Sequence, residues 1–179
     1  MVRELVVATA ALLVLGSSAD AGKVREFTVG DWTGAAFTED SGEFSHCAAY
    51  THGHGGPGIL FGINRDFLWS LGIVHLSWRM TVDATYDASL TIDDHTPIFV
   101  KGVAVADNNL EIDLEGKAAL FSLIRGGRQL TVIAADQVFT LKLYDSSQIL
   151  PNLTDCVRSG LNRMQAPFVP PRGLPPARR

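Results

Sequence analysis

The stretch VAVADNNLEIDLE, residues 103–115, decides the fold class. Val and Ala alternate before Asp107, and apolar and acidic residues alternate after Asn109, a period of two that is typical of β-strands. Asp and Asn tolerate the backbone of a tight turn. The stretch therefore predicts two antiparallel strands joined by a short hairpin turn. The residues expected to face the core are Leu110, Ile112 and Leu114.

Similar strand signals recur along most of the chain, separated by turn residues at regular spacing. Together they predict a mainly β protein, an antiparallel sandwich or barrel of about eight or more short strands. The further strands are expected within residues 44–51, 58–63, 68–74, 86–92, 96–100, 130–132 and 139–143.

One helix is predicted near the C-terminus and is expected to pack on the sheet. Pro151 fits only near a helix start, so we expect this helix to begin between residues 148 and 150. Residues 117–124 fit either a short helical turn or a strand. The apolar stripe of the C-terminal helix recurs at every fourth position. Its members are Ile149, Leu153, Val157 and Leu161.

The N-terminus is organised like a secretory signal peptide. Arg3 precedes an apolar run over residues 5–15, and Ala19 and Ala21 occupy the positions that a signal peptidase reads. The run is about half of the roughly 20 residues that a spanning helix needs. We therefore expect cleavage after Ala21, with an uncleaved membrane anchor as the alternative. Without residues 1–21 the protein is expected to be periplasmic or secreted, with no transmembrane segment.

The rest of the chain is predicted to form a single domain, residues 22–161, followed by a tail, residues 162–179. A body of about 140 residues buries enough surface for one core. The tail is rich in proline and holds four arginines and no acidic residue. Such a composition predicts a disordered segment.

The chain contains two cysteines, Cys47 and Cys156. In an oxidising compartment an even number of cysteines predicts pairing, and two cysteines allow one connectivity only. The bond would tie the C-terminal helix to an early strand and close a loop of about a hundred residues. Two separate buried thiols are the alternative.

Three histidines, His46, His52 and His54, lie close together in the sequence. Even-numbered positions share one face of an extended strand, so these imidazoles could converge on a zinc or copper ion. No H-E-x-x-H motif accompanies them, and the last two border a glycine-rich loop. One structural and two solvated histidines are the simpler interpretation, and no cofactor is predicted. A metal-binding protein or metal-dependent enzyme is the alternative.

Other catalytic patterns are weaker. Ser45 and His46 are neighbours, so on a regular strand their side chains point to opposite faces and do not easily form a nucleophile–base pair. A row of carboxylates, Glu111, Asp113 and Glu115, could attract calcium or assist a glycosidase. Such rows are more often solvated faces that discourage edge pairing. We therefore assign no catalytic residue.

Several short motifs give a family resemblance. They are Gly30-Asp31-Trp32, Phe44-Ser45-His46-Cys47-Ala48, Trp69-Ser70-Leu71-Gly72, Trp78-Arg79 and a late helix bearing Cys156. Together, over about residues 27–157, they resemble small exported bacterial proteins similar to the invasion-associated locus B-like periplasmic proteins. The resemblance implies a β-rich periplasmic domain with no established catalytic residues.

The predicted function follows from export, composition and the missing catalytic motifs. The formal net charge is −4, and an acidic protein repels phosphates, which argues against broad nucleic-acid binding. We expect a non-enzymatic envelope protein that binds an unidentified protein or other envelope partner. A purely structural accessory domain is a further alternative.

Overall fold

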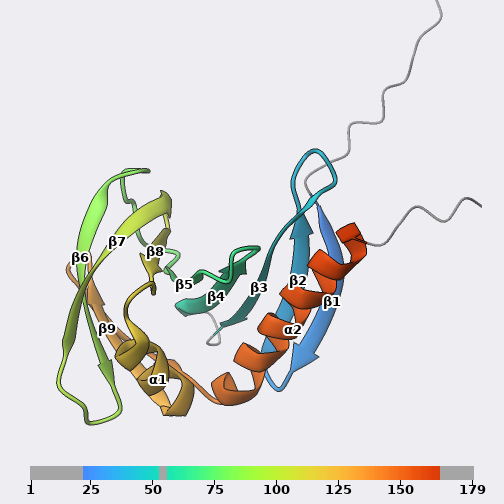
Figure 1. Cartoon of the computed structure of the whole chain (residues 1–179). Helices are drawn as coiled ribbons and strands as arrows, with labels where there is room; N and C mark the ends of the chain where they lie inside the picture. Colours follow the sequence, from blue (N-terminus) through green and yellow to red (C-terminus); the bar gives the residue numbers. More distant parts are fainter. Residues whose placement is uncertain (1–21, 53–55, 166–179) are drawn as a thin grey trace, which may run out of the picture.

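The computed structural model describes residues 22–52 and 56–165, which form ten strands and two helices (Figure 1). The predicted signal peptide, residues 1–21, lies outside the described residues, as do residues 166–179. The strands are β1 (Lys23–Val29), β2 (Trp32–Thr38), β3 (Phe44–His52), β4 (Gly58–Asn64), β5 (Trp69–Val74), β6 (Thr85–Ile92), β7 (Ile98–Ala106), β8 (Asn109–Asp113), β9 (Gln129–Ala134) and β10 (Gln137–Lys142). The helices are α1 (Ala118–Gly126) and α2 (Ser146–Gln165).

All ten strands belong to one antiparallel sheet with the order β1-β2-β3-β4-β5-β8-β7-β6-β9-β10. The first five strands pair in chain order. The chain then crosses to β6 and returns through β7 and β8, so that β8 pairs with β5, with Leu71 opposite Ile112. In Figure 1 the sheet is strongly curved: β1–β3 form one arm, β6–β8 form the other, and β4 and β5 lie between them.

The predicted mainly β class is confirmed, and its finer description as a sandwich or barrel needs one correction. The sheet is a single open layer that ends at β1 and β10, and these two strands do not pair over the described residues. The two helices supply the second layer that a sandwich would take from another sheet. Alternation in the sequence identifies the dry face of each strand but not its neighbours in the sheet.

The core lies between the sheet and the helices. The prediction that Leu110, Ile112 and Leu114 face the core is confirmed, since none of these side chains is more than 5% exposed. Burial of each such side chain contributes about 1.5–3 kcal/mol. Beside them the centre of the core is formed by Ile59, Phe61, Ile63, Leu71 and Ile73, each at most 1% exposed.

The predicted C-terminal helix is α2, and its apolar stripe packs on the sheet. It begins at Ser146, earlier than predicted, because the Asp145 carbonyl accepts hydrogen bonds from the backbone N–H groups of the third and fourth helical residues. Pro151 is accommodated inside the helix. The helix continues to Gln165, so residues 162–165 are helical and the predicted tail boundary was too early.

Residues 117–124, which fitted either a helical turn or a strand, lie mostly in the helix α1. Its Leu120 and Ile124 are buried. Neither α1 nor α2, the helices of the described ranges, combines the length and apolarity that a membrane crossing needs.

The predicted disulfide between Cys47 and Cys156 is confirmed, with an S–S distance of 2.01 Å and a Cα–Cα distance of 6.3 Å. It joins β3 to α2 inside the core, where Cys47 is fully buried and Cys156 is 7% exposed. Because 109 positions separate the two cysteines, the bond closes most of the domain into one loop.

Candidate functional site

The face of the sheet that points away from the helices carries a groove of about 540 Å³, which we call the sheet groove. Cys47 points toward α2 to form the disulfide, so its neighbour His46 lies on the opposite face, where it lines the groove. Strands β3, β4, β5, β7 and β8 all contribute to the lining. Its residues are Ser45, His46, Gly62, Ile63, Asn64, Leu68, Trp69, Ser70, Lys101, Val103, Val105, Glu111 and Asp113.

Small residues hollow the middle of this face. The strand register places Ala48 opposite Gly62, Gly62 opposite Ser70, and Ser70 opposite Asp113, so three small residues lie side by side across β3, β4 and β5. A Cβ atom at Gly62 would lie 2.7 Å from the Ser70 hydroxyl oxygen, so a larger residue here would require the Ser70 side chain to move. The curvature of the sheet and this run of small residues together create the groove.

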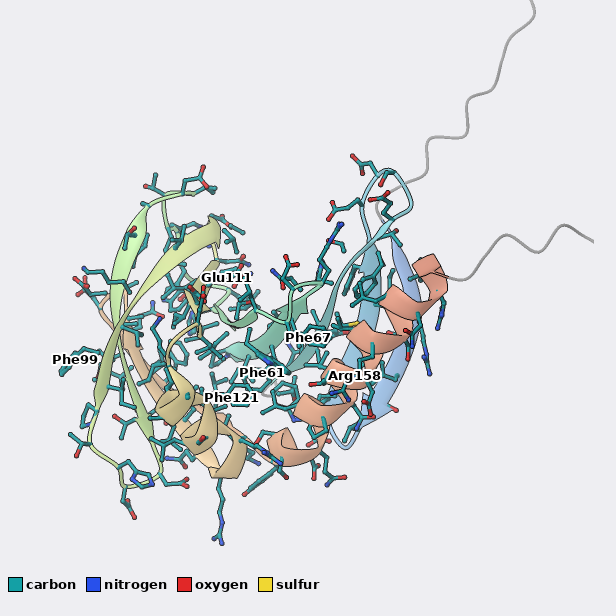
Figure 2. All side chains as sticks on the ribbon, in the orientation of Figure 1. Phe61, Phe67, Phe99, Glu111, Phe121 and Arg158 are labelled. Atoms are coloured by element: carbon teal, nitrogen blue, oxygen red, sulfur yellow. A yellow bond between two sulfur atoms is a disulfide. The ribbon has the colours of Figure 1, made fainter. Side chains whose placement is uncertain are left out.

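The lining of the sheet groove is amphipathic. On the β7–β8 side, Val103 and Val105 are 42% and 45% exposed, and Glu111 lies on the same side. In Figure 2 Glu111 lies on the inner side of the arm formed by β6–β8. Lys101 forms an exposed ion pair with Asp87 at 2.7 Å. The groove therefore offers apolar contact together with charges of both signs.

His46 is the titratable residue on the β3 side of the groove. Its imidazole stacks on Phe37, with ring centroids 4.7 Å apart and an interplanar angle of 10°. Burial lowers the pKa of His46, and this effect outweighs the opposite effects of the Glu39 and Glu111 carboxylates. Burial disfavours the charged form of any ionisable group, so His46 is a neutral ring at neutral pH that can donate and accept hydrogen bonds.

The prediction that Ser45 and His46 point to opposite faces was wrong. The Ser45 hydroxyl and the His46 Nδ1 atom are 3.1 Å apart. In the pairing of β2 with β3, Phe37 lies opposite His46 and Thr38 opposite Phe44, so Ser45 is the extra residue of a β-bulge. A bulge rotates the following side chains out of strict alternation, which brings the hydroxyl toward the ring.

The bulge also connects Ser45 to an acid. The Ser45 hydroxyl donates a hydrogen bond to Glu39 Oε1, and Arg65 Nη2 lies 3.9 Å from the same oxygen. The order is carboxylate, hydroxyl, imidazole, whereas acyl transfer needs the imidazole between the hydroxyl and the acid. This network orients His46 and the start of β3, and it presents hydrogen-bonding groups to the groove rather than an activated nucleophile.

The structure does not bring the predicted histidines together. His46 pairs with Asn64 and His52 with Gly58, at opposite ends of the β3–β4 hairpin. Six residues of strand separate their backbones by about 20 Å, while a zinc ion binds imidazole nitrogens at about 2 Å. The alternative in which His46 and His52 bind one ion does not fit this geometry, and His54 lies outside the described residues. No cluster of three metal-ligating side chains occurs within residues 22–52 and 56–165.

Two of the three carboxylates in the predicted row lie at the sheet groove. Glu111 and Asp113 line the sheet groove, whereas Glu115 follows β8 in a turn, where its backbone N–H donates to Asp113 Oδ1 at 2.8 Å. The sequence reasoning missed Lys101 and Asn64. No local signal could have found them, because their place in the groove depends on which strands are neighbours.

The geometry defines a class: an open, strongly curved antiparallel sheet with a disulfide-tied helix on one face and a groove on the other. One solved structure with a similar fold is that of invasion associated protein B from Bartonella henselae, with a TM-score of 0.55 and 15% sequence identity over 76% of this chain and 99% of that one. At this identity the comparison shows a shared fold, and it confirms the resemblance inferred from the sequence. Neither the protein-family models nor the curated proteins contain a match to this chain.

Proposed function

We propose that this chain is an exported, non-enzymatic accessory protein that binds an envelope partner through the sheet groove. The observation that carries the proposal is the groove itself, a hollow on the sheet face that points away from α1 and α2. Ligand pockets are typically about 300–1,000 Å³ in volume and combine apolar walls with a few polar groups. The sheet groove, at about 540 Å³, fits this description.

The chemistry of the lining favours a polypeptide segment as the bound group. Val103 and Val105 offer apolar contact, while Glu111, Asp113 and Lys101 offer charges that fix orientation. Interfaces between proteins also combine apolar contacts with polar and charged groups.

Two observations support an exported location. A disulfide closes the domain, and such bonds persist mainly in oxidising compartments. The similar structure belongs to a protein described as invasion associated, a description that favours an envelope or extracellular role for this fold.

Site-specific photo-cross-linking in intact cells of the native host tests this function. A benzophenone amino acid replaces Val103 in the sheet groove, and in a control it replaces Asn152, which is exposed on α2. We expect a discrete adduct from the Val103 position that is missing from the Asn152 position.

Two results would contradict the proposal. Equal adducts from both positions would indicate non-specific contact. A folded, exported protein that gives no adduct at Val103 would favour a structural accessory domain that does not use the groove.

A further inference from the structure

A second groove lies on the helix side of the sheet, between the first three strands and the last turns of α2, and we call it the helix groove. It encloses about 520 Å³. Its floor is apolar and recessed: Ala36, Phe44 and Cys156 are 6%, 5% and 7% exposed. Gly160 completes the floor, because the Phe44 ring approaches so closely that a Cβ atom at Gly160 would lie 2.5 Å from it.

Two arginines, Arg25 of β1 and Arg163 of α2, lie on the rim of this floor. Neither forms an ion pair within the described part of the chain, and nearby acids are used elsewhere. Glu26 pairs with Lys23 at 2.8 Å, and Asp155 pairs with Arg158 at 3.2 Å. Glu43 is the acidic residue of the lining, so the rim carries more positive than negative charge.

We propose that the helix groove binds a free, single-chain anionic amphiphile of the fatty-acid class. The alkyl chain lies on the floor formed by Ala36, Phe44 and Gly160, where it exchanges water for apolar contact. The carboxylate lies between Arg25 and Arg163, whose planar guanidinium groups match the geometry of a carboxylate. This site is separate from the sheet groove, and the inference does not depend on the proposed function.

The recessed floor of the helix groove favours a free molecule over a membrane surface as its ligand. Binding to a bilayer uses apolar side chains that protrude into the headgroup region. Here the large floor side chain, Phe44, is buried, and Val24 is the apolar residue of the rim that is widely exposed, at 55%. A single chain can enter such a groove, whereas a bilayer surface cannot reach its floor.

Calorimetric titration of the mature protein with decanoate below its micelle concentration tests the site. Decyltrimethylammonium and decanol serve as probes with the same chain and a positive or neutral head. We expect saturable binding of decanoate at one site, with decanol and decyltrimethylammonium at least about tenfold weaker, since tenfold corresponds to about 1.4 kcal/mol of lost charge attraction.

Charge variants separate the site from non-specific binding. Arg25→Glu combined with Arg163→Glu should weaken decanoate at least about tenfold and make decyltrimethylammonium the better ligand. Glu43→Gln should tighten decanoate binding, because it removes the opposing carboxylate. Lys142→Glu, the loss of an exposed cation on β10, is the matched control and should leave binding unchanged. These residues are exposed, and circular dichroism confirms that each variant is folded.

Several outcomes would overturn the inference. Equal binding of cationic and anionic probes, or binding unchanged by the double arginine variant, would show that the rim does not select charge. Capture by anionic phosphatidylglycerol vesicles without any decanoate binding would indicate a membrane-docking surface. If removal of residues 166–179 is required before decanoate binds, the C-terminal segment of this chain is the occupant.

Discussion

Burial of the His46 imidazole couples the stability of the protein to pH. The folded state favours the neutral ring, so the pKa of His46 lies below its usual 6.5, and the unfolded state binds more protons as the pH falls through that value. The free energy of unfolding should therefore decrease from about pH 7.5 to about pH 5.5. Urea unfolding of wild type and His46→Gln at both pH values measures this contribution, which the variant should lack.

The carboxylates that face His46, Glu39 and Glu111, act in the opposite direction and are kept in both proteins. Their effect on the His46 pKa disappears together with the imidazole in His46→Gln, so the comparison measures the net contribution of the histidine. An identical pH dependence in the two proteins would show that burial does not control its protonation.

Gly160 of α2 lies against the Phe44 ring. A Cβ atom there would lie 2.5 Å from a ring carbon. Overpacking of this kind costs about 1–3 kcal/mol, and helix propensity returns up to about 1 kcal/mol when alanine replaces glycine. We therefore expect Gly160→Ala to lower the free energy of unfolding by about 1–2 kcal/mol.

Gly126→Ala is the matched control for this change. Gly126 also lies in a helix, α1, but a Cβ atom there would meet nothing within 4 Å. It should be neutral or stabilising by at most about 1 kcal/mol. Similar losses at both positions in denaturant unfolding would contradict the close contact between Gly160 and Phe44.

At the residue scale, part of the site could be predicted from the sequence. His46, Glu111 and Asp113 were singled out because their residue types carry chemistry. The contact between Ser45 and His46 was missed because strict alternation assumes a regular strand, and a bulge depends on how β3 pairs with β2.

The disulfide is the strongest link between elements, because it fixes α2 to β3. It should stabilise mainly by restricting the unfolded chain, with native strain subtracting from the gain. The double change Cys47→Ala and Cys156→Ala should lower the free energy of unfolding by about 2–4 kcal/mol. Denaturant unfolding of oxidised protein measures this loss.

Reduction of the wild-type protein should reproduce the loss, whereas the double variant should not respond to reductant. Alkylation of unfolded wild-type protein provides a second test. Labelling of both cysteines without prior reduction would refute the bond in the protein from its native compartment.

Element types were largely predictable, because hairpins such as that of residues 103–115 are defined by local alternation and turn residues. Residues 117–124 were ambiguous, since Phe121 and Leu123 fit either periodicity and the decision came from packing on the core. α2 starts earlier than predicted. Pro151 favoured a start between residues 148 and 150, but the turn that begins at Asp145 starts the helix at Ser146.

The whole molecule should not depend on its C-terminal segment for stability. Residues 166–179 lie outside the described structure, and their Pro- and Arg-rich composition predicts little apolar burial. Their removal should change the melting temperature by less than about 4 °C, which corresponds to roughly 1 kcal/mol for a domain near this size. Differential scanning calorimetry of protein lacking residues 1–21, with and without the segment, measures this, and a larger drop would show that the segment packs on the domain.

Strand order is the whole-molecule property that the sequence could not reveal. The pairing of β5 with β8 joins distant segments, and no periodicity encodes it. This pairing places Glu111 and Asp113 across from β3, and so it builds the sheet groove. The sheet groove therefore depends on which strands are neighbours in the sheet. Its proposed role as a binding surface is tested on the intact protein.

The most direct test compares two identical charge reversals on either side of the groove boundary. Glu111 lines the sheet groove, and Glu115, in the turn after β8, does not. The yield of the Val103 photo-adduct in intact cells is measured in the Glu111→Lys and Glu115→Lys backgrounds at matched protein levels. If the partner binds in the groove, Glu111→Lys should reduce the yield at least about fivefold, because a reversed charge at a contact opposes binding, and Glu115→Lys should leave it unchanged. Equal yields in the two backgrounds would contradict the assignment of the groove as the binding surface.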